Sequence, residues 1–222
     1  MAVTEKVICV VGPTATGKTK MGVALAQRFD GEVVSVDSMQ IYRGMAVGTA
    51  APTAEEMEGV PHHMIGVADP WESWSAARFT EAADACMQDI LRRGKRPILV
   101  GGTGLYLDAL LRGIDFAAGS QDTPLRRQLQ ERLRREGAEA LLEELRRIDP
   151  DSAARLHLRD EKRILRALEV YQETGETITQ HDRRTREQPP RYEGLFVGLN
   201  FKDRQDLRDR IDRRVDDMVA QG

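Results

Sequence analysis

The chain has 222 residues, which is enough for one core domain and a smaller appended unit, and 41% of them are hydrophobic, as in an ordinary folded globular protein. The formal net charge of −3 excludes a global positive field, so any nucleic-acid binding must rely on local patches drawn from its 27 arginines. The sequence shows no signal-peptide pattern and no apolar run of membrane-spanning length, which predicts the cytoplasm.

The first half of the sequence alternates apolar strands with amphipathic helices. A continuous apolar run at 6–11 predicts a strand buried on both faces, and helical spacing follows over 18–29. A second strand is predicted at 32–36, a helix over 76–93 and a third strand at 96–100. Strands alternating with helices are typical of a parallel sheet, so we predict an α/β fold with helices flanking the sheet.

The second half begins with charged amphipathic helices that contain few β-branched residues. Helices are predicted at 125–147 and 160–174, with Pro150 ending the first and Gly175 in a C-cap position after the second. We interpret this block as a small all-helical insertion domain within the α/β core.

The end of the sequence returns to the core pattern. A strand is predicted at 194–200 and an amphipathic helix at 204–219. The sequence stops soon after this helix without a closing core element, which indicates a truncated chain. The predicted parts are the first portion of the core at 1–116, the helical insertion at 117–190, and the return strand and helix at 191–222.

A phosphate-binding loop follows the first strand. The run GPTATGKT at 12–19 matches G-x-x-x-x-G-K-[ST] between a strand and a helix, which predicts a P-loop NTPase-like sheet. Glycines let backbone amides turn around an anion, and the helix N-terminus adds partial positive charge. We expect Lys18 to reach the terminal phosphate oxygens and Thr19 to offer its hydroxyl to Mg²⁺. The predicted diphosphate- or triphosphate-binding residues are Gly12, Thr14, Ala15, Thr16, Gly17, Lys18 and Thr19.

Two further turns follow the other strands of the predicted core. Asp37 comes directly after the second strand, and ligands of open parallel sheets lie beyond the carboxyl ends of the strands. Its carboxylate could accept a proton from a nucleophile, hold a metal-bound water, or simply cap an Asx turn. A second glycine-rich turn at 101–104 could clasp the same ligand, with Thr103 donating to a phosphate oxygen, or could be a plain strand–helix connection.

The adjacent pair His62–His63 invites comparison with metal sites. Neighbouring residues of a strand point to opposite faces, and no third ligand with suitable spacing is present. We therefore expect structural hydrogen bonds from these imidazoles, with contact to substrate or RNA as the alternative.

Taken together, five segments resemble the tRNA dimethylallyltransferase family. They are GPTATGKT (12–19), DSMQIYRGMAVGTAAP (37–52), VPHHMI (60–65), GGTGLYLDALLRG (101–113) and RILRALEVYQETG (163–175), and the likeness extends through RIDRRVDDM (210–218). The chain departs from the usual family pattern at Thr16, where Ser is common, at Ala51, where Lys is usual, and at 157–160, where HLRD replaces HPND. Family members also continue beyond residue 222 with further helices.

The resemblance implies a reaction and a set of site residues. A dimethylallyl group would move from dimethylallyl diphosphate to N6 of the adenosine 3′ of the anticodon in tRNA, with Mg²⁺ as cofactor and diphosphate released. Asp37 would accept the N6 proton, Thr103 would contact the bridging oxygen, and Arg210 would hold the diphosphate. The insertion would clasp the anticodon stem, and we expect a monomer. The implied tRNA-binding residues are Ser38, Gln40, Tyr42, Arg163 and Arg166.

Three other functions share parts of this pattern. An adenylate isopentenyltransferase, which acts on free AMP, ADP or ATP, has the phosphate loop but needs no anticodon clasp. A small-molecule kinase needs an arginine-bearing lid, and no segment of the sequence resembles one. A non-catalytic nucleotide switch would leave Asp37 and Thr103 without a role, and the guanine-specificity motif N-K-x-D does not occur.

Overall fold

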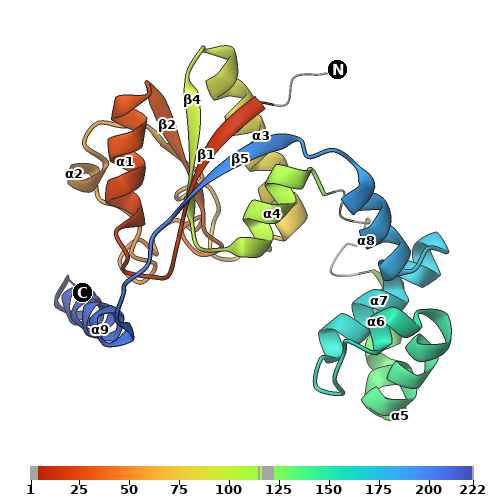
Figure 1. Ribbon diagram of the computed structural model, residues 1–222. Helices are drawn as coiled ribbons and strands as arrows, with labels where there is room; N and C mark the ends of the chain where they lie inside the picture. Colours follow the sequence, from red (N-terminus) through yellow and green to blue (C-terminus); the bar gives the residue numbers. More distant parts are fainter. Residues whose placement is uncertain (1–4, 115, 117–122, 222) are drawn as a thin grey trace. The chain divides into compact units, whose positions relative to one another are not determined.

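A computed structural model describes residues 5–114, 116 and 123–221 (Figure 1). The chain divides into two compact units, the first comprising Met1–Ile114 and Pro190–Gly222 and the second comprising Asp115–Pro189. The predicted start of the insertion, residue 117, lies outside the described residues. The role of the insertion as a tRNA clasp stays a prediction.

The first unit is built on a five-stranded, entirely parallel sheet in the order β3-β2-β4-β1-β5 (Figure 1). The strands are β1 (Glu5–Val11), β2 (Gly31–Val36), β3 (His62–His63), β4 (Arg96–Gly101) and β5 (Tyr192–Gly198). The predicted P-loop NTPase-like sheet is therefore confirmed, with four of its strands foreseen. β5 lies slightly earlier than predicted, and β3 was not predicted because two residues carry no periodicity.

Helices cover both faces of this sheet (Figure 1). Alternate strand residues such as Val10, Val33 and Ile98 pack towards α1 (Lys18–Arg28), while Cys9, Val34 and Leu99 pack towards the opposite layer. That layer contains α3 (Ala76–Arg92) and α4 (Gly104–Arg112), whose Phe79 and Tyr106 rings stack at 4.4 Å. The unit also holds α2 (Ala54–Met57) and α9 (Arg204–Gln221). Among the helices described, none is both long and apolar enough to cross a bilayer.

Three strands end at the same level of the sheet. Gly101 at the end of β4 pairs with Val11 at the end of β1 and with Val36 at the end of β2. Because all three strands run in one direction, the turns that follow them meet at one edge. The register therefore brings the phosphate loop, the Asp37 turn and the second glycine-rich turn together.

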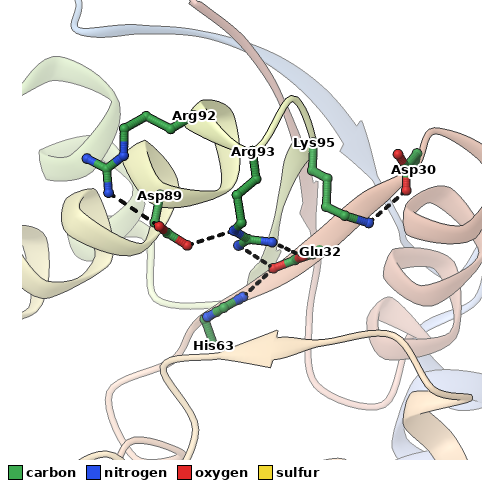
Figure 2. Close-up of polar contacts among 7 residues, drawn as sticks. All are labelled: Asp30, Glu32, His63, Asp89, Arg92, Arg93 and Lys95. Atoms are coloured by element: carbon green, nitrogen blue, oxygen red, sulfur yellow. Dashed lines mark hydrogen bonds and ion pairs between the residues drawn. The ribbon is translucent and has the colours of Figure 1, made fainter.

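A buried ion-pair network joins β2 to β3 and to the end of α3 (Figure 2). The carboxylate of Glu32, 4% exposed, accepts two hydrogen bonds from the Arg93 guanidinium and lies 2.8 Å from Nε2 of His63. Arg93 also donates to Asp89. Hydrogen bonding to Arg93 lowers the pKa of Glu32 to about 2, despite its burial. The network fixes the short edge strand β3, which has few backbone bonds of its own.

The second unit is all helical, as predicted. It comprises α5 (Pro124–Ile148), α6 (Pro150–Ala153), α7 (Glu161–Thr174) and α8 (Ile178–Glu187). α5 is interrupted at Gly137, whose φ of 82° is non-helical, and α7 ends at Gly175 in the left-handed conformation, as expected of a C-cap glycine. Its apolar core includes Leu129, Leu141, Leu145, Ile164 and Leu168. This unit thus has its own hydrophobic core.

We predict that Glu32→Gln destabilises the protein by roughly 2 kcal/mol near neutral pH, because it removes the buried carboxylate to which the half-exposed Arg93 guanidinium donates. The unfolded carboxyl titrates near 4.5 and the folded one near 2, so the wild-type contribution is present above 4.5 and is lost as pH falls through that window. The difference between wild type and variant in urea unfolding should shrink accordingly.

Glu193→Gln is the matched control, since Glu193 forms an exposed pair with Lys6 at 3.8 Å. It should change stability by less than about 1 kcal/mol. Equal effects of the two substitutions, or a pH-independent effect of Glu32→Gln, would contradict a structural role for the network.

Candidate functional site

The phosphate loop connects β1 to α1 and turns through unusual backbone conformations. Gly12, Ala15 and Gly17 have φ values of 153°, 65° and 87°. A Cβ on Gly12 would lie 2.3 Å from the carbonyl oxygen of Leu199, so only glycine fits there. Gly17 caps α1 without a side-chain hydrogen bond, which leaves the first amides of the helix to an anion.

Lys18 folds its side chain back across the loop. Its ammonium donates to the carbonyl oxygen of Pro13 at 2.7 Å, as the hydroxyl of Thr16 does at 2.8 Å. Burial lowers the pKa of Lys18 and the positive charge of Arg214 lowers it further, while Asp37 acts in the opposite direction. The loop therefore has a partly desolvated cation at its centre. Thr19, in the first turn of α1, is half-buried, and Thr14 is exposed at the tip of the loop.

The second glycine-rich turn lies against the first. A Cβ on Gly101 would lie 2.0 Å from the carbonyl oxygen of Val36, so β4 can approach β2 this closely only with glycine there. A cleft of about 260 Å³ opens between the two turns. Its lining residues are Val11, Gly12, Pro13, Gly101, Gly102, Thr103, Gly104 and Leu107. The turn at 101–104 therefore shares one cleft with the phosphate loop, and its role in clasping a ligand stays a prediction.

Thr103 lines this cleft, and Asp37 belongs to the turn that is hydrogen-bonded to Thr103. Oδ1 of Asp37 accepts hydrogen bonds from the amides of Met39 at 2.8 Å and Gln40 at 3.2 Å. Asp37 thus caps an Asx turn, the structural alternative considered for it. The amide of Ser38 donates to the hydroxyl oxygen of Thr103 at 3.3 Å, which leaves the hydroxyl proton for another acceptor. This bond ties the Asp37 turn to the second glycine-rich turn.

The side chains of Gln40 and Tyr42 already have partners inside the protein. Gln40 accepts from the hydroxyl of Ser35 at 2.9 Å and donates to the carbonyl oxygen of Ala50 at 3.2 Å. The hydroxyl of Tyr42 donates to the carbonyl oxygen of Glu72 at 3.4 Å. These bonds hold the segment after Asp37 in place. The tRNA contacts expected of Ser38, Gln40 and Tyr42 stay predictions.

Two arginines of α9 are placed differently. The Arg210 guanidinium lies over the ring of Phe201, 5.7 Å from its centroid. Arg214, one turn later, donates to the carbonyl oxygen of Ala50 at 3.1 Å and acts electrostatically on Lys18. Of these two arginines, Arg214 is the one whose positive charge lowers the pKa of Lys18, and sequence reasoning missed it. The role expected of Arg210 stays a prediction.

The predicted tRNA-binding arginines of the second unit lie on α7. Arg163 is exposed, whereas Arg166 pairs with buried Glu169 at 2.9 Å. Glu169 also pairs with Arg126 at 3.1 Å. The Arg126–Glu169 pair joins α5 to α7, whereas the Arg166–Glu169 pair lies within α7 and adds a second cation to the buried carboxylate. The tRNA contacts of Arg163 and Arg166 stay predictions.

The histidine pair makes the structural hydrogen bonds expected of it. Nδ1 of His62 lies 2.8 Å from the carbonyl oxygen of Val60, and His63 joins the network of Glu32. Burial lowers the pKa of His62, which favours its neutral form. Within the described ranges, no group of three or more His, Cys, Asp or Glu side chains is arranged to hold a metal ion.

The chain matches two family profiles, one described as IPP transferase over residues 40–222 and one as isopentenyl transferase over residues 5–65. It is 49% identical to a tRNA dimethylallyltransferase of Pelobacter propionicus over 98% of this chain and 70% of that protein. It is also similar to the tRNA isopentenylpyrophosphate transferase of Bacillus halodurans, with a TM-score of 0.65 and 44% identity over 98% of this chain and 67% of that one.

A further solved structure, a eukaryotic dimethylallyltransferase acting on tRNA, gives a TM-score of 0.84 and 35% identity. The match covers 99% of this chain and 54% of that one.

We predict that Lys18→Ala weakens the binding of inorganic diphosphate by roughly 10- to 100-fold, the contribution expected of a charge-assisted hydrogen bond. Calorimetric titration would measure this. The fold should be retained, because the ammonium of Lys18 donates to the carbonyl oxygen of Pro13 within the loop and does not belong to the hydrophobic core. Lys20→Ala, an exposed lysine of the same helix, is the matched control and should bind normally. Loss of thermal stability with normal binding per folded molecule would instead make Lys18 structural.

We also predict that Arg214→Ala weakens diphosphate binding by about 10-fold or more, while Arg210→Ala changes it less, because the charge of Arg214 lowers the pKa of Lys18 whereas Arg210 lies over the ring of Phe201. The same titration compares the two variants. A larger loss for Arg210→Ala would assign the diphosphate to Arg210, as the resemblance implies.

Proposed function

This chain belongs to the IPP transferase family, and from that premise we propose that it is a tRNA dimethylallyltransferase. It transfers the dimethylallyl group of dimethylallyl diphosphate to N6 of the adenosine 3′ of the anticodon in tRNA. The C–O bond to diphosphate breaks, the bond from N6 to the allylic carbon forms, and N6 gives up a proton.

One observation carries the assignment of this chemistry to the cleft. The Ser38–Thr103 hydrogen bond joins the Asp37 turn to the glycine-rich turn that, with the phosphate loop, lines the cleft. A carboxylate and a phosphate-binding surface thus adjoin each other. Prenyl transfer needs this combination, since a proton leaves on one side of the reacting carbon and diphosphate leaves on the other.

The leaving group is stabilised by cations and backbone amides. Lys18 and the loop amides are proposed to bind the diphosphate oxygens, and Thr103 to donate its hydroxyl proton to the bridging oxygen. Arg214 is proposed to add a second cation, shared with or in place of Arg210. Negative charge on these oxygens grows as the C–O bond breaks, so the contacts strengthen in the transition state.

Asp37 is proposed to accept the N6 proton. The nitrogen lone pair of adenine is delocalised into the ring, so N6 is a poor nucleophile until its proton is taken up. Both amide hydrogen bonds to this side chain end on Oδ1. They fix the direction of the carboxylate, and Oδ2 can then receive the proton.

The hydroxyl oxygen of Thr19 is a hard donor of the kind that Mg²⁺ prefers. Mg²⁺ in phosphate sites takes most of its ligands from phosphate oxygens and water and only one or two from protein. The Thr19 hydroxyl is the proposed protein ligand. When bound, Mg²⁺ supplies neutralising charge to the diphosphate.

Recognition of tRNA is proposed to involve the helical unit and the segment after Asp37. An acceptor in a folded RNA must leave its stack to enter a cleft, which requires contacts beyond the reacting base. A separate helical unit, present here with its own core, favours a macromolecular acceptor over free adenylate. We propose that the chain acts as a monomer in the cytoplasm.

The decisive experiment offers the protein several acceptors with labelled dimethylallyl diphosphate and Mg²⁺. Unmodified tRNA should become labelled and AMP should not. Labelling of AMP instead of tRNA would make the protein an adenylate isopentenyltransferase, and phosphate transfer from ATP to a small acceptor would make it a kinase. If the protein binds nucleotide but modifies none of these acceptors, it would instead be a non-catalytic nucleotide switch.

We predict that Asp37→Asn lowers the rate of prenyl transfer to tRNA by roughly 10²- to 10⁴-fold, as expected for loss of a general base, with little change in tRNA affinity. Asn keeps the turn-capping oxygen but cannot accept the proton. Single-turnover kinetics with pre-bound tRNA would measure the loss.

Asp30→Asn is the control, because Asp30 is exposed and lies just before β2, at the end of the strand away from Asp37. This variant should transfer the prenyl group at the wild-type rate. A near-normal rate for Asp37→Asn would reduce Asp37 to its role in the turn. Rescue by added Mg²⁺, with the loss mainly in diphosphate affinity, would assign Asp37 to the metal.

A further inference from the structure

Trp71 is the most exposed of the large hydrophobic side chains identified in the described residues, with 83% of its surface accessible. An indole is the largest apolar side chain, and surface exposure of most of it forgoes the burial that usually stabilises it. Trp74, three residues later, is half-buried against the core, with the Arg78 guanidinium 4.5 Å from its ring centroid. Of the two tryptophans in this segment, only Trp71 therefore presents most of its surface to solvent.

The turn that carries Trp71 is rigid. The amide of Glu72 donates to the carbonyl oxygen of Asp69 at 2.9 Å, and the amide of Asp69 donates to Oε1 of Glu72 at 2.9 Å. Arg78 pairs with the other carboxylate oxygen of Glu72. Trp71 lies between these two closing bonds, so its backbone is fixed before any partner arrives and little entropy is lost on contact.

The same turn is attached to the segment that follows Asp37. Arg43 pairs with Asp69 at 2.7 Å and donates to the carbonyl oxygen of Val67 at 3.0 Å. Tyr42 forms a backbone bridge with Ala68, and its hydroxyl donates to the carbonyl oxygen of Glu72. Trp71 is thereby held at the carboxyl edge of the sheet, where the acceptor nucleoside is proposed to enter.

We infer that the indole of Trp71 is a stacking platform for an unpaired nucleobase of the anticodon loop, next to the adenosine that is modified. The inference rests on the proposed function. Withdrawal of one base from a loop leaves its neighbours unstacked, and aromatic side chains take over such faces in RNA-binding proteins. Asp69 and Glu72 are each paired with an arginine, so the turn does not present uncompensated negative charge to RNA.

The test measures binding of a labelled anticodon stem–loop RNA by fluorescence anisotropy. Trp71→Ala should weaken binding by about 10-fold or more, and Trp71→Tyr, which keeps an aromatic face, should restore most of it. Phe29→Ala is the matched control, because Phe29 is an exposed aromatic side chain at the C-terminal end of α1, and it should bind as wild type. Binding of dimethylallyl diphosphate should be unchanged in all variants, and so should binding of a fully paired duplex of the same stem.

Three outcomes would overturn the stacking role. Trp71→Ala could bind the stem–loop within about two-fold of wild type, Trp71→Tyr could bind as weakly as Trp71→Ala, or the duplex could lose affinity equally. Concentration-dependent self-association that disappears in Trp71→Ala, with RNA binding intact, would assign the indole to a protein contact instead.

Prenyl transfer by the wild-type protein separates this failure from failure of the proposed function. If wild type modifies the stem–loop and Trp71→Ala binds it normally, only the stacking role is lost. If wild type neither binds nor modifies the RNA, the proposed function falls and the stacking role falls with it.

Discussion

The site depends on close approaches of backbone to backbone where three strands end in register. β4 can lie so near β2 only because Gly101 has no Cβ to meet the carbonyl of Val36, and the phosphate loop can lie beside the residues after β5 only because Gly12 leaves room for Leu199. Side chains at these positions would push the turns apart. The cleft between the turns is thus a consequence of packing in the sheet as much as of the loop motif.

This constraint explains which parts could be predicted from sequence. Strands buried on both faces are continuous apolar runs, and β1, β2 and β4 were predicted because each ends at a glycine or at Asp37. The phosphate loop is recognised because its requirements are local: glycines at fixed spacing, then Lys18 and Thr19 at the start of a helix. The helical unit was recognised in the same way, from spacing and from Gly175.

The remaining features depend on contacts between residues far apart in the chain. Glu32 begins a strand and would be expected at the surface, yet it is buried because Arg93 and His63 supply its partners. Gln40 turns inward because the hydroxyl of Ser35 donates to its side-chain oxygen and the carbonyl oxygen of Ala50 accepts from its side-chain nitrogen. Resemblance implies that Arg210 holds the diphosphate, but Arg210 and Arg214 are one turn apart on α9, and only packing decides which of them lies nearer the loop.

Asp37 shows how one side chain can serve the fold and the proposed reaction together. In the proposed reaction a base beside diphosphate must be held against repulsion from its charge, and the hydrogen bonds from the amides of Met39 and Gln40 to Oδ1 can hold Asp37 in this way. Gln40 in turn is bonded to Ala50, whose carbonyl also receives Arg214. The carboxylate, the turn that directs it and the cation near Lys18 therefore form one connected set of hydrogen bonds. By capping the turn, Asp37 fixes the direction of its own carboxylate, which the proposed reaction needs to point towards the incoming adenine. The structural role of Asp37 and its proposed chemical role therefore support each other.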